Sequence, residues 1–152
     1  MELILADVKT EQPIAVPRAR QAGYWGYFHS DLTDGEAVFV LGAADPTRLL
    51  WQTLEVWASQ EAVRNFQVLP PGEYAAQLTP EAFPGDYQAT GVVGSILWLE
   101  EDWEHAVIDV LVGPCKFSIR AEEIGQEVDL GYGQWVSFRV KRLTFWDLES
   151  LP

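Results

Sequence analysis

Cysteine, basic residues and long apolar runs are all scarce in this chain. Cys115 is the single cysteine, which excludes an internal disulfide framework. No run of apolar residues reaches the length of about 18 that a transmembrane helix needs. The first residues include Glu2 and Asp7 and no basic region, so they do not resemble a secretory signal. These absences predict a soluble, cytoplasmic protein with no membrane association.

Positive charge is outnumbered throughout the sequence. The 152 residues carry 10 Lys and Arg against 23 Asp and Glu, a formal net charge of −13. No Lys or Arg lies between Arg64 and Lys116. Nucleic-acid binding takes most of its affinity from basic side chains that neutralise phosphates, so a nucleic acid is disfavoured as partner, though not excluded. An acidic field attracts a basic protein surface, whereas acidity also serves solubility by itself, and both interpretations stay open.

The composition is that of a globular protein with a sizeable core. Hydrophobic residues make up 48% of the chain and aromatic residues 12%, which excludes a disordered chain. The length predicts a single compact domain over 1–152. The segment 79–88 is rich in proline and glycine, so it is a candidate internal boundary. It would separate an N-terminal hairpin-plus-helix half from a C-terminal barrel half.

One helix and several strands are expected from the apolar patterns. Residues 24–42 predict a β-hairpin, because two aromatic and β-branched runs flank a link that contains Asp-Gly. An α-helix is expected near residues 46–58, with Asp45 as its N-cap and Pro46 in its first turn. The apolar residues of that segment recur at helical spacing, at Leu50, Leu54 and Trp57.

The last third of the chain has the most regular strand pattern. A short helical turn ending at Gly125 separates the third predicted strand from the last, whose apolar face changes at Lys141-Arg142. The predicted strands are 90–100, 106–113, 115–121 and 134–148. Their order over residues 88–147 resembles a small barrel of the oligonucleotide/oligosaccharide-binding (OB) type. The expected fold is therefore mainly β (α+β), with antiparallel strands in a small, partly closed, OB-like barrel.

Short catalytic motifs are missing from the sequence. It contains no phosphate-binding loop, no dinucleotide turn, no nucleophile elbow and no zinc-protease helix motif. Two histidines and one cysteine cannot supply the four N or S ligands of a structural zinc site. We therefore expect no catalytic residue, metal or cofactor, and the chain is more typical of a non-enzyme. An enzyme with a dispersed carboxylate or metal site remains the second alternative.

Asp109 stands alone among the acids because it lies in the middle of a predicted strand. Its neighbours Ile108 and Val110 are apolar. If that face is buried, the carboxylate needs a partner such as Arg139 or Lys116, in a structural salt bridge. The alternative is that Asp109 lies on a half-exposed edge.

Two groups of residues are candidates for binding. In the acidic link between two strands, one tryptophan is flanked only by carboxylates, which resembles an interface hot spot with a charged rim. This group is Glu100, Glu101, Asp102, Trp103 and Glu104. The alternative is that this tryptophan folds back onto the barrel. Three other tryptophans fit apolar faces and are expected in the core: Trp57, Trp98 and Trp146. The second group is basic and would hold an oligonucleotide or small ligand on the barrel: Lys116, Arg120, Arg139 and Lys141.

These features together predict a non-catalytic, acidic protein-interaction module. Its partner would be a basic protein surface, as it is for inhibitors and immunity-type proteins that act on nucleases. The alternative is an OB-like domain that binds an oligonucleotide or a small ligand.

Overall fold

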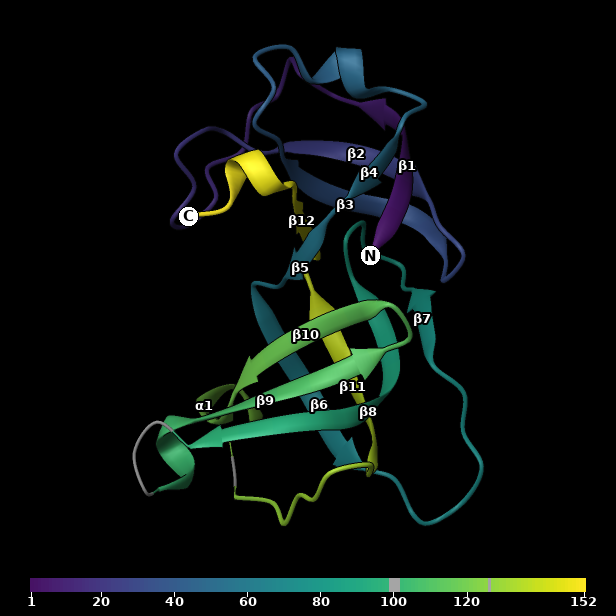
Figure 1. Ribbon diagram of the computed structural model, residues 1–152, viewed down its shortest axis with the longest axis vertical. Coiled ribbons are helices and arrows are strands. Elements are labelled where there is room, and N and C mark those ends of the chain that lie inside the picture. The colour runs from purple at the N-terminus through teal and green to yellow at the C-terminus, as the bar shows by residue number, and fades with distance from the viewer. Residues whose placement is uncertain (99–101, 126) are drawn as a thin grey trace.

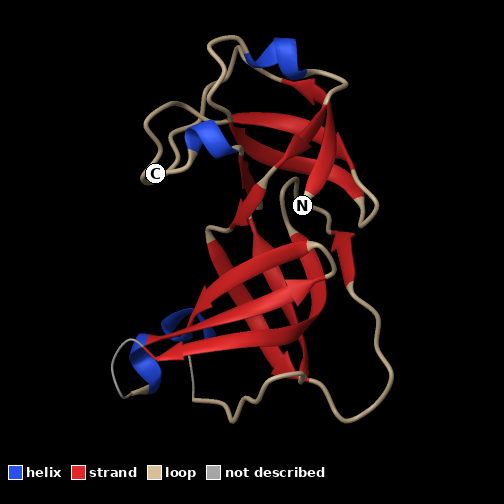
Figure 2. Ribbon diagram, viewed as in Figure 1, coloured by secondary structure: helices blue, strands red, loops and turns tan. Residues whose placement is uncertain are grey.

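The computed structural model describes residues 1–98, 102–125 and 127–152, and its fold is mainly β, as the sequence predicts (Figures 1 and 2). The strands form two sheets, and one continuous cluster of buried hydrophobic residues draws side chains from both. The strands of the first sheet are β1 (Glu2–Val8), β2 (Tyr24–His29), β3 (Asp34–Val40), β4 (Thr53–Glu55), β5 (Trp57–Ser59) and β12 (Thr144–Trp146). The second sheet holds β6 (Ala62–Val68), β7 (Gln77–Pro80), β8 (Tyr87–Trp98), β9 (Ala106–Val112), β10 (Cys115–Arg120) and β11 (Trp135–Lys141).

The first sheet has the strand order β4-β1-β2-β3-β12-β5. The hairpin expected over 24–42 is confirmed, because β2 and β3 pair antiparallel from Tyr24↔Phe39 to His29↔Asp34. At the other edge of β3, the C-terminal strand β12 pairs in parallel. The N- and C-terminal parts of the chain are thereby held in one sheet.

The second sheet is nearly closed and barrel-like, with the order β10-β9-β8-β11-β6 and β7 beside β8. Near the opening, the side-chain amide of Gln60 donates a 3.1 Å hydrogen bond to the carbonyl of Ser118 in β10. The helix α1 (Ala121–Ile124) follows β10 and ends at Gly125, whose φ of 81° is left-handed. The short helical turn predicted there is confirmed, because glycine adopts this conformation without steric cost.

The two sheets exchange strands along the chain. β6 lies before the segment 79–88 in sequence, yet it pairs with β11 in the second sheet. β12 lies after that segment, yet it belongs to the first sheet. The change of face expected at Lys141-Arg142 is the point where the chain leaves one sheet for the other. The sheets are therefore not consecutive halves of the chain, and the boundary near 79–88 stays a prediction.

The prediction of an α-helix near residues 46–58 is wrong. Only Pro46–Leu49 is helical, as the 3-10 turn η1, and Asp45 caps it as predicted by accepting from the Thr47 amide at 3.1 Å. Trp51 then takes a left-handed φ of 65°, and the chain continues as β4 and β5. These strands pair with β1 and β12, which have free edges there. Tertiary strand pairing overrides the local helical spacing.

The core draws on large side chains from both sheets. In the first sheet Phe28, Phe39 and Phe145 lie with their ring centroids 5.1 to 6.3 Å apart. In the second, Phe117 and Phe138 meet edge-on at 5.7 Å. Edge-to-face packing of this kind adds to the stabilisation that burial gives. In the described parts of the chain, no helix is both long and apolar enough to span a bilayer.

Candidate functional site

The acidic link predicted to bind a partner joins β8 to β9, at the end of their hairpin (Figure 1). Glu100 and Glu101 lie outside the residues that the structure describes. Asp102 is the N-cap of the 3-10 turn η2 (Trp103–His105), and its Oδ1 accepts from the His105 amide at 3.2 Å. The same oxygen lies 2.6 Å from His105 Nδ1, and this hydrogen bond lowers the pKa of Asp102. Asp102 therefore carries its negative charge at neutral pH.

Of the two tryptophans at this tip, Trp103 takes the alternative position, folded back onto the barrel, and Trp98 is the exposed one. Trp103 is half-buried and packs against the core, with its ring 6.3 Å from that of Trp98 and edge-on to it. Trp98 is 52% exposed and Leu97 is 57% exposed. The expectation that Trp98 lies in the core is wrong, because β8 runs beyond the core before it turns. Its position beside the acidic link was the sequence signal for this exposure.

Asp109 lies on the outer face of β9 between two neighbouring strands. Its partners are serines: Ser95 of β8 donates to Oδ2 at 2.9 Å, and Ser118 of β10 donates to Oδ1 at 2.7 Å. The half-exposed alternative for Asp109 is therefore the one that the structure shows, and serines take the place of Arg139 or Lys116 as its partners. The face is only half-buried, so the carboxylate needs no full counter-charge, and two hydroxyl donors satisfy it.

The four basic residues of the alternative site lie on two separate strands. Lys116 and Arg120 belong to β10, and Arg139 and Lys141 to β11. β9 and β8 lie between these strands in the sheet order, so β10 and β11 are not hydrogen-bonded neighbours. Arg139 donates to Glu81 at 2.7 Å. The four residues therefore do not lie on adjacent strands, and a common basic site made of them stays a prediction.

Groups for metal or nucleophilic chemistry are dispersed. Within residues 1–98, 102–125 and 127–152, no three His, Cys, Asp or Glu side chains cluster as metal ligands would. His29 lies 3.2 Å from Asp34, at the other end of the molecule from His105. Cys115 is buried, and burial raises the pKa of its thiol to about 12. A thiol in this state is a poor nucleophile.

Comparison with known proteins finds no matching family model, no matching curated protein and no matching solved structure. A function for this chain is therefore argued from its own residues and geometry.

Proposed function

We propose that this protein is a non-catalytic, acidic interaction module that binds a basic protein surface through the end of its β8–β9 hairpin. The observation that carries the proposal is the exposure of two large apolar side chains, Leu97 and Trp98, at this tip. They lie within the stretch that contains no Lys or Arg between Arg64 and Lys116.

The tip combines the two components of a protein-binding hot spot. An exposed tryptophan gives a large area to bury, and a polar rim excludes water around it. Here the rim includes the ionised Asp102 and the exposed Glu104. A surface with this charge attracts a basic partner and raises its association rate.

The Trp98 side chain is also held in position before a partner binds. The half-buried Trp103 packs edge-on against Trp98 and against the core. A side chain that is already positioned loses less conformational entropy on binding, so more of its contact energy appears as affinity. This support argues for a binding role for Trp98 rather than an incidental exposure.

We also propose that the second sheet has an OB-like topology. It is supported by the chain order β8, β9, β10, α1 and β11, with β6 next to β11 as the remaining strand. We favour a protein over an oligonucleotide because the basic residues lie on strands that are not adjacent, β10 and β11, and because Arg139 is already paired with Glu81. A cytoplasmic location is likewise a proposal, supported by the single, unpaired thiol of Cys115.

The test is affinity capture from the native lysate, followed by reconstitution with the purified captured protein. We expect the capture to yield one basic protein. In calorimetry, Trp98→Ala should bind this protein at least about tenfold more weakly than the wild type does. Glu104→Lys should also weaken binding. Raising the salt from about 0.1 M to about 1 M shortens the Debye length from roughly 10 Å to 3 Å and should weaken the wild-type complex.

Two control variants separate the tip from the rest of the surface. Trp51→Ala removes a tryptophan that is 68% exposed and follows η1, at the opposite end of the molecule in Figure 1. Glu73→Lys makes the same charge change as Glu104→Lys in another exposed loop. Both should bind as the wild type does. The proposal fails if the captured protein binds Trp98→Ala as tightly as the wild type.

A further inference from the structure

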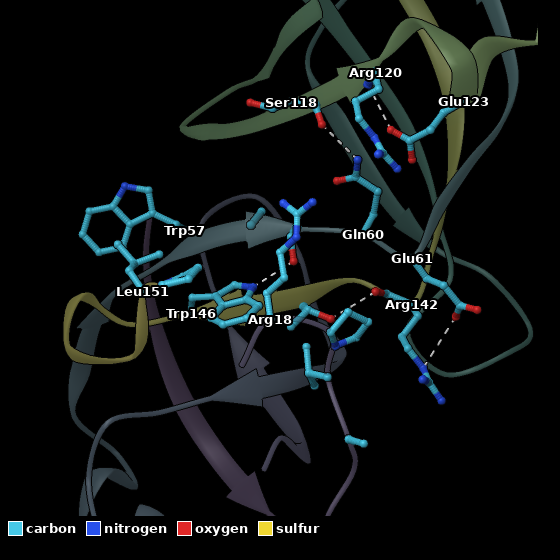
Figure 3. A pocket seen from close by; sticks show the side chains of 17 residues that line it. Arg18, Trp57, Gln60, Glu61, Ser118, Arg120, Glu123, Arg142, Trp146 and Leu151 are labelled. Atoms are coloured by element: carbon cyan, nitrogen blue, oxygen red, sulfur yellow. Dashed lines mark hydrogen bonds and ion pairs between the residues drawn. The ribbon is translucent and has the colours of Figure 1, made fainter. Parts of the chain in front are cut away.

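A cavity of about 710 Å³ lies between the two sheets, away from the β8–β9 tip (Figure 3). Its walls come from segments far apart in the sequence: residues 15–18, β5 and the link 60–61 that follows it, the end of β10 with α1, residue 142 with β12, and residues 151–152. A volume of this size is within the range of small-molecule sites. The proposed interaction surface does not use this cavity.

The charge of the lining is opposite to that of the protein. Two of the chain's 23 Asp and Glu line the cavity, Glu61 and Glu123. Three of its 10 Lys and Arg do so: Arg18, Arg120 and Arg142. On a protein of net charge −13, this cavity is a local concentration of guanidinium groups. Arginine is the side chain best suited to hold carboxylate and phosphate groups, because its planar donors match their oxygens.

The arginines are only partly neutralised by their neighbours. Among the described residues, Arg18 makes no ion pair, and Arg142 Nε is 3.8 Å from Glu61. Arg120 pairs with the exposed Glu122 at 2.9 Å, while the Glu123 carboxylate accepts from the Arg120 backbone amide. In Figure 3 the side chains of Arg18 and Arg120 extend into the space around Gln60. Donors of at least Arg18 are therefore available to an anion.

Gln60 contributes an acceptor that lacks a donor. Its Nε2 donates to the Ser118 carbonyl, but its buried Oε1 has no hydrogen-bond partner within the described parts of the chain. Leaving a buried acceptor unpaired is costly, and such atoms in native proteins call for an explanation. A ligand that brings an O–H or N–H group to Oε1 would satisfy it.

Tryptophan side chains form the apolar part of the lining. Trp146 is buried, as the sequence predicts, and its Nε1 donates to Ser59 at 2.8 Å, which fixes its ring. Trp57 is 39% exposed, so its expected place in the core is wrong. It lines the cavity instead. An accessible indole ring next to arginines offers a stacking surface for a planar group.

The backbone is strained at two of the arginines. Arg18 has a φ of 67° and Arg142 a φ of 52°, and in the described chain only Trp51 and Asn65 share this region among non-glycine residues. A left-handed conformation is disfavoured for a residue with a Cβ relative to the right-handed one. Strain of this kind gathers at functional sites, where the side chain is needed despite its cost.

We propose that this cavity binds a small aromatic anion, a carboxylate or phosphate that also carries a hydrogen-bond donor. Its anionic group lies against Arg18 and its neighbouring arginines. Its ring packs on Trp57, and its donor reaches Gln60 Oε1. The residues that contact the ligand come from both sheets, so the bound ligand also connects the two sheets.

Calorimetric titration with defined probes tests the proposal. Adenosine monophosphate and para-hydroxybenzoate represent the phosphate and carboxylate classes. Adenosine and phenol are their uncharged counterparts, and inorganic phosphate lacks the ring. We expect saturable binding of at least one aromatic anion, at least tenfold tighter than that of its uncharged counterpart and of phosphate. Arg18→Gly should weaken this binding at least tenfold.

Arg18→Gly is informative because it separates binding from folding. Glycine adopts a φ of 67° freely, so the variant should keep the wild-type melting temperature while it loses the ligand. Arg142→Gly repeats the test at the second strained position. Arg48→Ala removes an exposed arginine outside the cavity and should bind as the wild type does. The proposal is overturned if neither aromatic anion binds, if adenosine or phenol binds as tightly, or if Arg18→Gly leaves affinity unchanged.

Discussion

The hydroxyl of Tyr87 in β8 donates a 2.7 Å hydrogen bond to the carbonyl of Glu36 in β3, and so joins the two sheets. Tyr87 is buried, and its ring also lies 6.5 Å from that of Phe28 in the first sheet. Burial raises the pKa of the Tyr87 phenol, so it stays a protonated donor. A Cβ at Gly35 would collide with this hydroxyl, so the missing side chain leaves it room.

Tyr87→Phe should lower the free energy of unfolding by about 1 to 3 kcal/mol. The variant removes the donor of this part-buried hydrogen bond, so the Glu36 carbonyl loses the Tyr87 hydroxyl as a partner. Urea denaturation followed by fluorescence measures the change. Tyr132→Phe removes a hydroxyl from an exposed ring and should leave the midpoint unchanged. Equal midpoints for the two variants would show that the inter-sheet bond adds no stability.

Gly35→Ala should destabilise the protein by about 1 to 3 kcal/mol, because the new methyl group displaces the Tyr87 hydroxyl. In a Tyr87→Phe background the same substitution should cost less, since the nearest colliding atom is gone. Thermal unfolding of the four proteins of this cycle measures the coupling. Gly131→Ala is the matched control, because its Cβ would meet nothing closer than 3.9 Å. Full additivity of the two substitutions would contradict this contact.

Ser118→Ala should cost about 0.5 to 1.5 kcal/mol in the wild type and close to nothing in an Asp109→Ala background. The reason is that the Ser118 hydroxyl stabilises the fold through its 2.7 Å bond to Asp109. Chemical denaturation of the single and double variants gives the comparison. Lys116→Ala, which removes the basic partner that the sequence suggested, should show no such dependence on Asp109. If Lys116 and not Ser118 couples to Asp109, the assignment of partners here is incorrect.

Cys115 should resist alkylation by iodoacetamide in the folded protein and react fully in urea. Only the thiolate reacts, and burial raises the pKa of this thiol from 9.0 to about 12. Mass spectrometry follows the labelling. Modification of the native protein at the rate of a free thiol near neutral pH would rule out this burial.

The raised pKa of the Cys115 thiol makes the free energy of unfolding depend on pH. Between about pH 9 and pH 12 the folded thiol keeps a proton that the unfolded thiol has lost, so stability falls as the pH rises through this window. The expected slope is about 1 kcal/mol per pH unit. Urea midpoints of the wild type and Cys115→Ala, measured at pH values on both sides of about 9, isolate this contribution. The stability difference between the two proteins should shrink as the pH rises.

Features that depend on neighbouring residues could be predicted from the sequence. Alternation placed Phe117 and Ile119 inside the barrel, and both are buried. Gly125 ends a helical turn and the chain changes sheet at Arg142, as local turn chemistry and the shift of the apolar face indicate. The mainly β, barrel-like fold follows from such signals, because side-chain period and turn preference are local properties.

Features that depend on contacts between residues far apart in the chain could not be predicted from the sequence. The segment after Pro46 has helical spacing, yet it forms strands because the edges of β1 and β12 accept it. Trp98 is exposed because β8 extends beyond the core. Asp109 meets Ser95 and Ser118 because of the register of β9 with β8 and β10, which the sequence pattern left open. Pairing is long-range, and its energy depends on which edges and surfaces the rest of the fold leaves open.

Composition and pattern by themselves determined that the protein is acidic, mainly β and without short catalytic motifs. Only the tertiary structure decided which side chains meet. It placed Tyr87 against Gly35 between the sheets, and it brought Arg18, Gln60 and Arg142 to one cavity. The reason is physical: an alternating strand specifies which of its faces is apolar, whereas strand order and register decide what that face, and the opposite one, will touch.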